Sequence, residues 1–241
     1  MALIDPSSPI VILTGAGISK ESGLDTFRCE GGIWSQVRLE DVATPQAFAR
    51  DPALVHRFYN DRRRGLLDPA VQPNAAHRAI ARLQRSWPAP VLLVTQNIDD
   101  LHERGGSPDV LHMHGELLKA RCTQTGRVFD WRMDLGVETP SPATGLPGGL
   151  RPNVVWFGEM PFGMDVIADA LAGCGLFISM GTSGHVYPAA GFVREAKETG
   201  GAMTVELNLD PSEGASWFDQ AIHGPATTVV PQFVDRLLAG L

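Results

Sequence analysis

Cysteine is scarce in this sequence: Cys29, Cys122 and Cys174 are the only three among 241 residues. Three scattered thiols do not form a disulfide framework, and they cannot by themselves make a four-thiolate zinc site. Long apolar stretches are also missing, because no run approaches the roughly 18 residues of a membrane-spanning helix. The first nine residues lack the basic and apolar regions of a signal peptide. We therefore expect a cytoplasmic protein with no membrane partner.

Positive charge is in deficit as well. Twenty Lys and Arg residues face 27 Asp and Glu residues, a formal net charge of −7, and there is no basic tail. This balance argues against nonspecific adhesion to nucleic acid, so we expect no nucleic-acid partner. The 44% hydrophobic content is ordinary for a folded chain, and the length suits one large core with a small additional module.

Short apolar runs alternate with helical patterns along the chain. The runs cover residues 10–14, 91–95, 176–180 and 204–208. Their near-continuous apolarity is typical of strands that are covered on both faces, so we predict an α/β fold with a doubly wound parallel sheet. We predict helices from Asn74 to about Arg85, from near Asp51-Pro52, and from Pro231 to Leu238.

Two stretches interrupt this alternation and predict a smaller inserted module. Residues 29–72 are polar, aromatic and helical in pattern. Residues 114–152 contain a strand-turn-strand pattern at Thr123-Gln-Thr-Gly126 and end in a loop rich in Pro and Gly. The larger, Rossmann-like domain would then comprise residues 1–28, 73–113 and 153–241.

A glycine-rich turn, Gly15-Ala-Gly-Ile-Ser-Lys20, follows the first predicted strand. Glycines at such a turn let the backbone approach a pyrophosphate at a helix N-terminus, although the same pattern also ends strands for structural reasons alone. The dehydrogenase fingerprint needs a third glycine where Lys20 stands and an acidic residue about 20 positions later. Neither is present, so the turn favours a dinucleotide ligand without hydride transfer.

Six short motifs together resemble the sirtuin family. They are Gly15-Ala-Gly-Ile-Ser19, Thr26-Phe-Arg28, Thr95-Gln-Asn-Ile-Asp99, His114-Gly-Glu116, Phe157-Gly-Glu159 and Gly181-Thr-Ser183, in the order in which sirtuins show them. The resemblance implies a Rossmann-like domain and a small module, with NAD and acyl-lysine in the cleft between them. It further implies that the acyl oxygen attacks the nicotinamide ribose, giving an alkylimidate, nicotinamide and finally deacylated lysine with 2'-O-acyl-ADP-ribose.

The resemblance selects His114 as the catalytic base and Asn97 as a residue that orders ribose hydroxyls. Histidine suits the task because its ordinary pKa, about 6.5, lets it accept a proton near neutral pH. His112 is the rival, and on a strand the two side chains would point to opposite faces. The implied cofactor-binding residues are Gly15, Ala16, Gly17, Ile18, Phe27, Arg28, Gln96, Asn97, Ile98, Asp99, Gly181, Thr182, Ser183 and Asn208. Asp99 would hold the nicotinamide carboxamide, Arg28 would face the phosphates, and Asn208 would lie near the adenine ribose. Read without the resemblance, Asn97 and Asp99 are a capped turn and Asn208 a polar strand end.

Tyr59 and Arg62 stand three positions apart in a helical pattern, so both reach one face of the helix. Together they could hold a carboxylate, because arginine offers a planar fork and tyrosine a neutral donor. The pair resembles the signature of class III, desuccinylase-like sirtuins, and Ala43 matches the small residue that leaves room for the acyl chain. The other implied substrate contacts are Val155, Phe157, Gly158 and Val186. The alternative is that Arg62-Arg63-Arg64 is a solvated basic face and Tyr59 a packing residue.

The small module departs from the family pattern of two Cys-x-x-Cys pairs. Thr125 stands at the partner position of Cys122, and residues 136–149 contain no cysteine. A tetrahedral site needs about four strong ligands, so we expect NAD as the cofactor and no zinc. The expected partners are proteins or peptides that carry acylated lysine. Two other functions stay open: a mono-ADP-ribosyltransferase, and a non-catalytic module that binds NAD or ADP-ribose.

Overall fold

A six-stranded, wholly parallel sheet organises the larger part of the chain. The computed structural model describes residues 4–25 and 38–241. The strand order is β3-β2-β1-β7-β8-β9. These strands are β1 (Ile10–Thr14), β2 (Val91–Thr95), β3 (Leu111–His112), β7 (Leu176–Met180), β8 (Met203–Asn208) and β9 (Gln220–His223). The chain leaves β1 toward one edge and later returns to its other side at β7. Ligands bind beyond the carboxyl ends of parallel strands at such a switch point.

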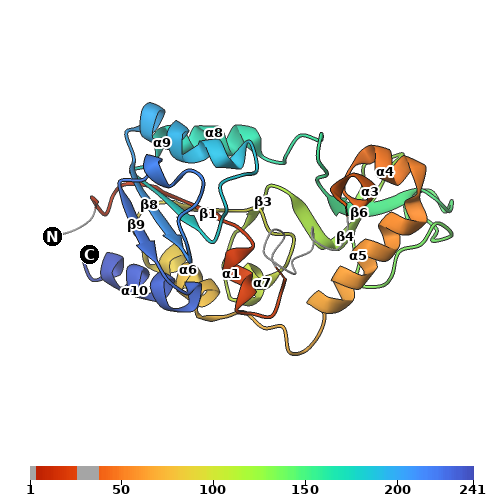
Figure 1. Cartoon of the computed structure of the whole chain (residues 1–241), viewed down its shortest axis with the longest axis horizontal. Helices are drawn as coiled ribbons and strands as arrows, with labels where there is room; N and C mark the ends of the chain where they lie inside the picture. The colour runs from red at the N-terminus through yellow and green to blue at the C-terminus, as the bar shows by residue number, and fades with distance from the viewer. Residues whose placement is uncertain (1–3, 26–37) are drawn as a thin grey trace.

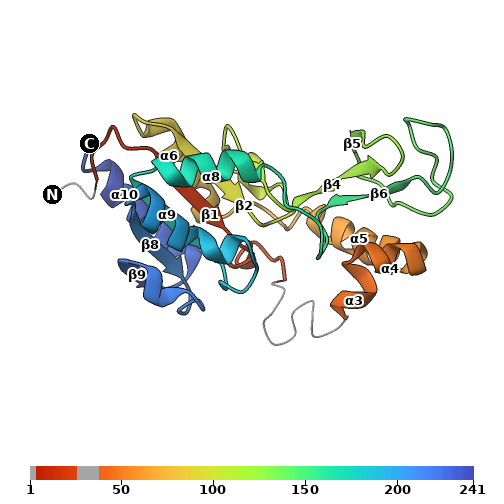
Figure 2. The same ribbon diagram turned by 90° about the horizontal axis from the view of Figure 1, so that it is seen from above.

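Helices cover both faces of this sheet, with α6 (Ala75–Ser86) and α10 (Ala226–Leu238) on one face and α8 (Met164–Gly173) and α9 (Phe192–Gly200) on the other (Figures 1 and 2). Side chains of β1 alternate between the two layers. Ile10 and Ile12 join the core under α6 and α10, whereas Val11 and Leu13 join the core under α8 and α9. Burial on both faces explains why the strands are apolar throughout.

The smaller module extends from one end of this sheet, where Figure 2 shows β4, β5 and β6 beside α3, α4 and α5. Its antiparallel sheet has the order β5-β4-β6. The strands are β4 (Gly115–Cys122), β5 (Val128–Asp130) and β6 (Leu150–Val154), and the helices are α3 (Leu39–Val42), α4 (Pro45–Arg50) and α5 (Pro52–Leu66). Because β6 pairs with β4 as far as Val154, the small sheet continues beyond the boundary expected at residue 152.

Helix boundaries follow capping side chains where the sequence has them. The Asn74 side chain accepts a hydrogen bond from Ala76 N–H at the start of α6, and Asp51 accepts one from Leu54 N–H at the start of α5. The prediction that the last helix begins at Pro231 is wrong, because α10 begins at Ala226 and Pro231 lies inside it. Proline within a helix is unfavourable. Here the buried face formed by Val229, Val230 and Phe233 holds the helix through that position.

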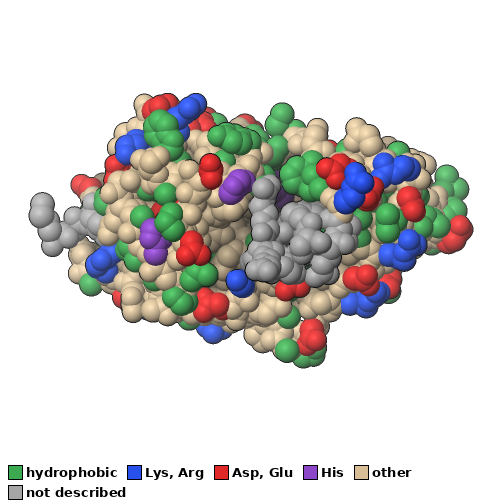
Figure 3. Space-filling model, in the orientation of Figure 1, with side chains coloured by type: hydrophobic (Ala, Val, Ile, Leu, Met, Phe, Trp, Pro, Cys, Tyr) green, Lys and Arg blue, Asp and Glu red, His purple; other side chains and the backbone are tan. Residues whose placement is uncertain are grey.

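Two short helices, α1 (Gly17–Lys20) and α7 (Leu101–Arg104), and two 3₁₀ turns at Ala189–Gly191 and Ala215–Trp217 complete the described elements. Among the described residues no helix combines the length and apolarity needed to cross a membrane. On the face drawn in Figure 3, Lys and Arg side chains are scattered among Asp and Glu side chains.

Candidate active site

Two glycine-containing turns meet beyond the carboxyl ends of β1 and β7. Gly17 N–H donates to Gly181 O at 2.8 Å, and Gly15 N–H donates to Met180 O at 3.0 Å. A Cβ at Gly17 would lie 2.8 Å from the backbone of Gly181, and Gly181 itself has φ +64°. Glycine is therefore required here by the contact between the two turns. The Gly15 and Gly17 amides are bonded within the protein, so these bonds fix the two turns against each other.

A cavity of about 980 Å³ opens beside these turns, between the large domain and the module. It brings together most of the residues that the sequence predicted. Those lining it are Gly15, Ala16, Gly17, Ala43, Tyr59, Arg62, Gln96, Asn97, Ile98, His114, Val155, Phe157, Gly158, Gly181, Thr182, Ser183, Val186 and Asn208. Ile18 does not line it, because its side chain is fully buried in the core under α6 and α10. Phe27 and Arg28 lie outside the described residues.

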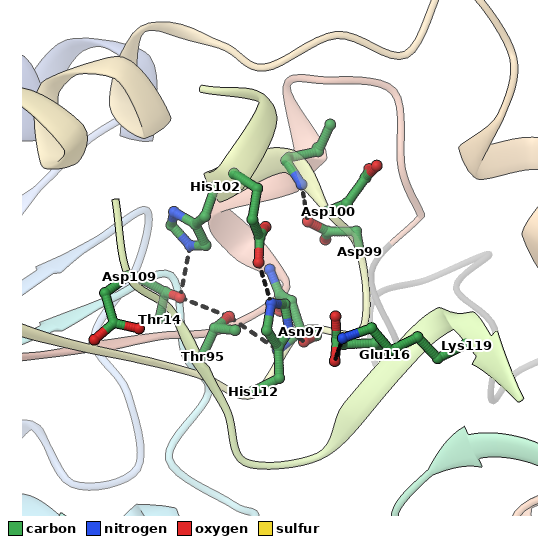
Figure 4. A network of polar contacts seen from close by, with 12 residues as sticks. Thr14, Thr95, Asn97, Asp99, Asp100, His102, Asp109, His112, Glu116 and Lys119 are labelled. Carbon is green, nitrogen blue, oxygen red and sulfur yellow. Dashed lines mark hydrogen bonds and ion pairs between the residues drawn. The ribbon is translucent and has the colours of Figure 1, made fainter. Parts of the chain in front are cut away.

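The hydrogen bonds of His112 and His114 distinguish the two histidines chemically. His112 lies beside Asn97 (Figure 4), with its Nδ1 3.2 Å from Asn97 O. Its Nε2 lies 2.6 Å from a Glu103 carboxylate oxygen. Both partners are acceptors, so both ring nitrogens of His112 carry hydrogen. Burial opposes that charge, but the hydrogen bond and the charge of Glu103 outweigh it and raise the pKa of His112. A raised pKa favours the imidazolium form, so His112 is a poorer candidate for the base than His114.

His114 has the opposite arrangement. Its Nδ1 lies 3.2 Å from Gln96 O, so Nδ1 carries the hydrogen and Nε2 keeps its lone pair. Burial lowers the pKa of His114, and the bond to Gln96 O offsets this only in part. The neutral ring therefore dominates at neutral pH, at a position that lines the cavity. His114, which the family motif selects, therefore has a ring nitrogen at the cavity that could accept a proton.

A buried polar cluster lies below the cavity floor. Ser19 Oγ donates to Asp99 Oδ2 at 2.9 Å and lies 3.2 Å from Asn97 Nδ2, which donates to it. Asp99 Oδ1 accepts from Leu101 N–H at 3.1 Å. Burial raises the pKa of Asp99 to about 6, although its hydrogen bonds with Leu101 N–H and Ser19 Oγ oppose the shift. Asp99 does not line the main cavity but an adjoining one of about 390 Å³, which Asn97 and Ile98 also line.

Ser19 belongs to this cluster, yet it received no role from the sequence. Its place in the Gly15–Ser19 motif was the available signal. Neighbouring side chains extend the cluster toward the sheet, where Thr14 Oγ1 lies 2.8 Å from Thr95 Oγ1 and 2.9 Å from His102 Nε2 (Figure 4). Several polar groups on β1, β2 and α7 are therefore fixed against one another beneath the cavity. Nothing in a linear pattern pairs Thr14 with His102.

The three consecutive arginines of α5 have three different environments. Arg62 is half-buried at the cavity, and desolvation lowers its pKa. Arg63 is fully buried and donates to Leu117 O and Asn60 Oδ1. Arg64 is exposed and pairs with Asp61 and Asp134. The alternative of one solvated basic face is therefore wrong, since only Arg64 fits it.

Tyr59 lies beside Arg62 at the module end of the cavity and is 4% exposed. Burial raises the pKa of Tyr59 to about 12, so the phenol is neutral at physiological pH. Ala43 is buried nearby and its carbonyl accepts from Phe157 N–H at 3.0 Å. A cation, a neutral hydroxyl and a small side chain thus meet at this end of the cavity.

The opposite end of the cavity is formed by the turn after β7. Asn208 Nδ2, at the end of β8, donates to Thr182 O at 2.8 Å and fixes this turn. Asn208 therefore has a structural role in the turn as well as a place in the cavity wall.

The position where the family pattern places zinc is occupied by hydrogen-bonding and apolar side chains. Cys122 is fully buried, and hydrogen bonds with Ser141 and Thr125 lower the pKa of its thiol to about 7. Leu135 and Leu150 pack with it in the small core of the module. Within residues 4–25 and 38–241, the group of side chains close enough to share an ion is Glu103, His112 and Glu116, which does not include Cys122.

Comparison with known proteins agrees with this geometry. A family model described as the Sir2 family matches residues 15–188. The NAD-dependent protein deacylase of Shigella flexneri is 59% identical over 232 residues, covering 96% of this chain and 85% of that protein. The NAD-dependent protein deacylase SIR2rp3 of Trypanosoma brucei brucei is 56% identical over 237 residues, covering 98% and 97%. A crystal structure of a Sir2 homologue–NAD complex superposes with a TM-score of 0.86 at 38% identity, covering 96% and 90%. Sir2Af2 bound to a myristoylated histone peptide gives a TM-score of 0.75 at 31% identity, covering 96% and 92%.

Proposed function

This chain belongs to the Sir2 family, and on that premise we propose that it is an NAD-dependent protein lysine deacylase that removes acetyl and succinyl groups. The products would be nicotinamide, deacylated lysine and 2'-O-acyl-ADP-ribose. The observation that carries the proposal is the state of His114, a neutral histidine at the cavity with its Nε2 lone pair unprotonated. We further propose a cytoplasmic location, which the free thiols of Cys122 and Cys174 support.

The cavities suit NAD in size and in polarity. The main cavity, at about 980 Å³, is at the upper end of ordinary ligand sites, and the adjoining one is lined by Asp99, whose carboxylate can accept hydrogen bonds from a carboxamide. When bound, NAD supplies an electrophilic ribose carbon from which nicotinamide departs. Asn97 would orient the ribose hydroxyls, Asp99 would hold the carboxamide, and His114 Nε2 would accept the hydroxyl proton.

The acyl group would lie at the module end of the cavity. Arg62 offers a fixed positive charge and Tyr59 a neutral hydroxyl, and partial burial strengthens both interactions with a carboxylate. Ala43 leaves space where a larger side chain would intrude. These three residues support removal of acidic acyl groups in addition to acetyl, with Val155, Phe157, Gly158 and Val186 as proposed contacts for the rest of the substrate.

The test is to incubate the protein with NAD and matched acetyl- and succinyl-lysine peptides and to identify the products by mass spectrometry. We expect deacylated peptide and acyl-ADP-ribose in equal amounts. ADP-ribosylated protein would replace the proposal with a transferase, and absence of nicotinamide release would replace it with a binding module.

Acyl specificity is tested with Tyr59→Phe combined with Arg62→Met. We expect kcat/KM for the succinyl peptide to fall about 10- to 100-fold relative to the acetyl peptide, the range for losing hydrogen bonds to a charged group. Arg64→Met is the matched control, because Arg64 lies on the same helix but pairs with surface carboxylates. An unchanged succinyl-to-acetyl ratio in the double variant would show that the acyl assignment is wrong.

A further inference from the structure

The Tyr59 hydroxyl is hydrogen-bonded to the indole of Trp156, a residue for which the sequence predicted no role. Trp156 Nε1 donates to the Tyr59 hydroxyl oxygen at 3.0 Å. Both side chains are buried, at 4% exposed for Tyr59 and 2% for Trp156, and both line the cavity. Trp156 follows β6 and Tyr59 lies on α5, so this bond ties the small sheet to the helix that carries Arg62.

An Arg151–Glu159 ion pair contacts both the ring and the backbone of Trp156. The Arg151 guanidinium lies 3.4 Å from the centre of the Trp156 ring, stacked over it. Arg151 also donates to both carboxylate oxygens of Glu159, at 2.6 and 2.9 Å. Glu159 in turn accepts from the backbone N–H of Trp156 at 2.8 Å. The indole therefore has little freedom to turn away from Tyr59.

The direction of this hydrogen bond determines what the tyrosine can do. An indole N–H only donates, so it occupies a lone pair of the phenol oxygen and leaves the phenolic hydrogen to be donated elsewhere. Among the described residues, no hydrogen bond from the Tyr59 hydroxyl to a protein acceptor is formed. Accepting one hydrogen bond also makes a hydroxyl a stronger donor. A carboxylate in the cavity beside Arg62 is an acceptor that suits this hydrogen.

We propose that Trp156 is a positioning residue for acidic acyl groups: its indole N–H orients the Tyr59 hydroxyl so that this hydroxyl donates to the carboxylate of a succinyl-type substrate. The inference rests on the proposed acyl function. It assigns a specific task to the nitrogen of Trp156, because a phenylalanine would keep an aromatic ring beside Phe48 and Arg151 but would lack the donor.

The experiment measures kcat and KM for succinyl- and acetyl-lysine peptides in Trp156→Phe, Tyr59→Phe and the double variant. For Trp156→Phe we expect the succinyl KM to rise about three- to tenfold, the range for one hydrogen bond, while succinyl kcat and both acetyl constants stay within about twofold. In the Tyr59→Phe background, Trp156→Phe should change the succinyl KM by less than about twofold, because the partner oxygen is gone.

Trp131→Phe is the matched control, since Trp131 is in the same module but packs in the core around Cys122. If Trp156→Phe folds poorly, replacing Trp156 with benzothienylalanine, which has sulfur in place of N–H, keeps the ring shape and removes the donor. Equal losses on both substrates, an unchanged succinyl KM, or effects that multiply in the double variant would each overturn the role of Trp156. If Tyr59→Phe itself leaves the succinyl-to-acetyl ratio unchanged, the acyl assignment fails and the role of Trp156 fails with it.

Discussion

Asp99→Asn should make the protein more stable while removing the carboxylate that we propose binds the nicotinamide carboxamide. Burial raises the pKa of Asp99 from 3.8 to about 6, which corresponds to a bias of up to about 3 kcal/mol against the folded carboxylate at neutral pH. Asparagine removes this charge and still accepts from Leu101 N–H. Its amide can donate to Ser19 Oγ, which has a second lone pair for Asn97. We therefore expect the variant to gain roughly 1–3 kcal/mol in free energy of unfolding at pH 7.5.

The pH dependence of that gain tests its electrostatic origin. Because the folded pKa lies above the unfolded value, the cost of Asp99 is complete above about pH 6 and vanishes below about pH 4, where both states are protonated. Urea unfolding of both proteins should show a difference at pH 5.0 that is about half of the difference at pH 7.5. Asp100→Asn is the control, since Asp100 pairs with Arg104 and Arg132 at the surface and should gain nothing. A variant that is less stable at pH 7.5, or a gain that does not change with pH, would refute the argument.

Other predictions concern the histidines and the module. Activity should be constant around pH 7.5 and fall on the acid side with an apparent pKa below the usual 6.5 of histidine. The proposed mechanism needs His114 neutral and Asp99 as a carboxylate, and protonation removes either form. A midpoint above pH 7 would contradict the burial of His114. His112→Asn should cost less than about tenfold in kcat, since His112 supports Asn97 but is no base. Treatment with a chelator should leave the melting temperature within about 1 °C, because hydrogen bonds and apolar packing surround Cys122; a loss of several degrees would show that a metal stabilises the module.

The parallel sheet and its helices were largely predictable, because burial on both faces leaves a clear mark in the sequence. The strands at 10–14, 91–95 and 176–180 were predicted to the residue, and Asn74 and Asp51 begin helices as expected. The start of α10 was missed for a physical reason. Local rules place proline at a helix start, whereas the packing of Val229 and Val230 extends the helix across Pro231.

The site was predictable in its motifs but not in its supporting contacts. Eighteen of the residues named from the sequence line one cavity. The motifs could not show that Gly17 is needed for contact with Gly181, or that Ile18 faces the core. Nor could they separate Arg62 from Arg63, which differ by one helical step of about 100° and hence in environment. The bond from Trp156 to Tyr59 spans 97 positions, and no local pattern encodes it.

The most direct test of the account compares His114→Ala with His112→Ala in the NAD-dependent deacylation of one acetyl-lysine peptide. The rate is measured as the formation of 2'-O-acetyl-ADP-ribose. Loss of a general base costs about 10²- to 10⁴-fold in rate. We predict a loss of that size in His114→Ala and a loss below about tenfold in His112→Ala. A His114→Ala protein that keeps near-normal product formation, or a His112→Ala protein that loses it, would contradict the assignment of His114 as the catalytic base.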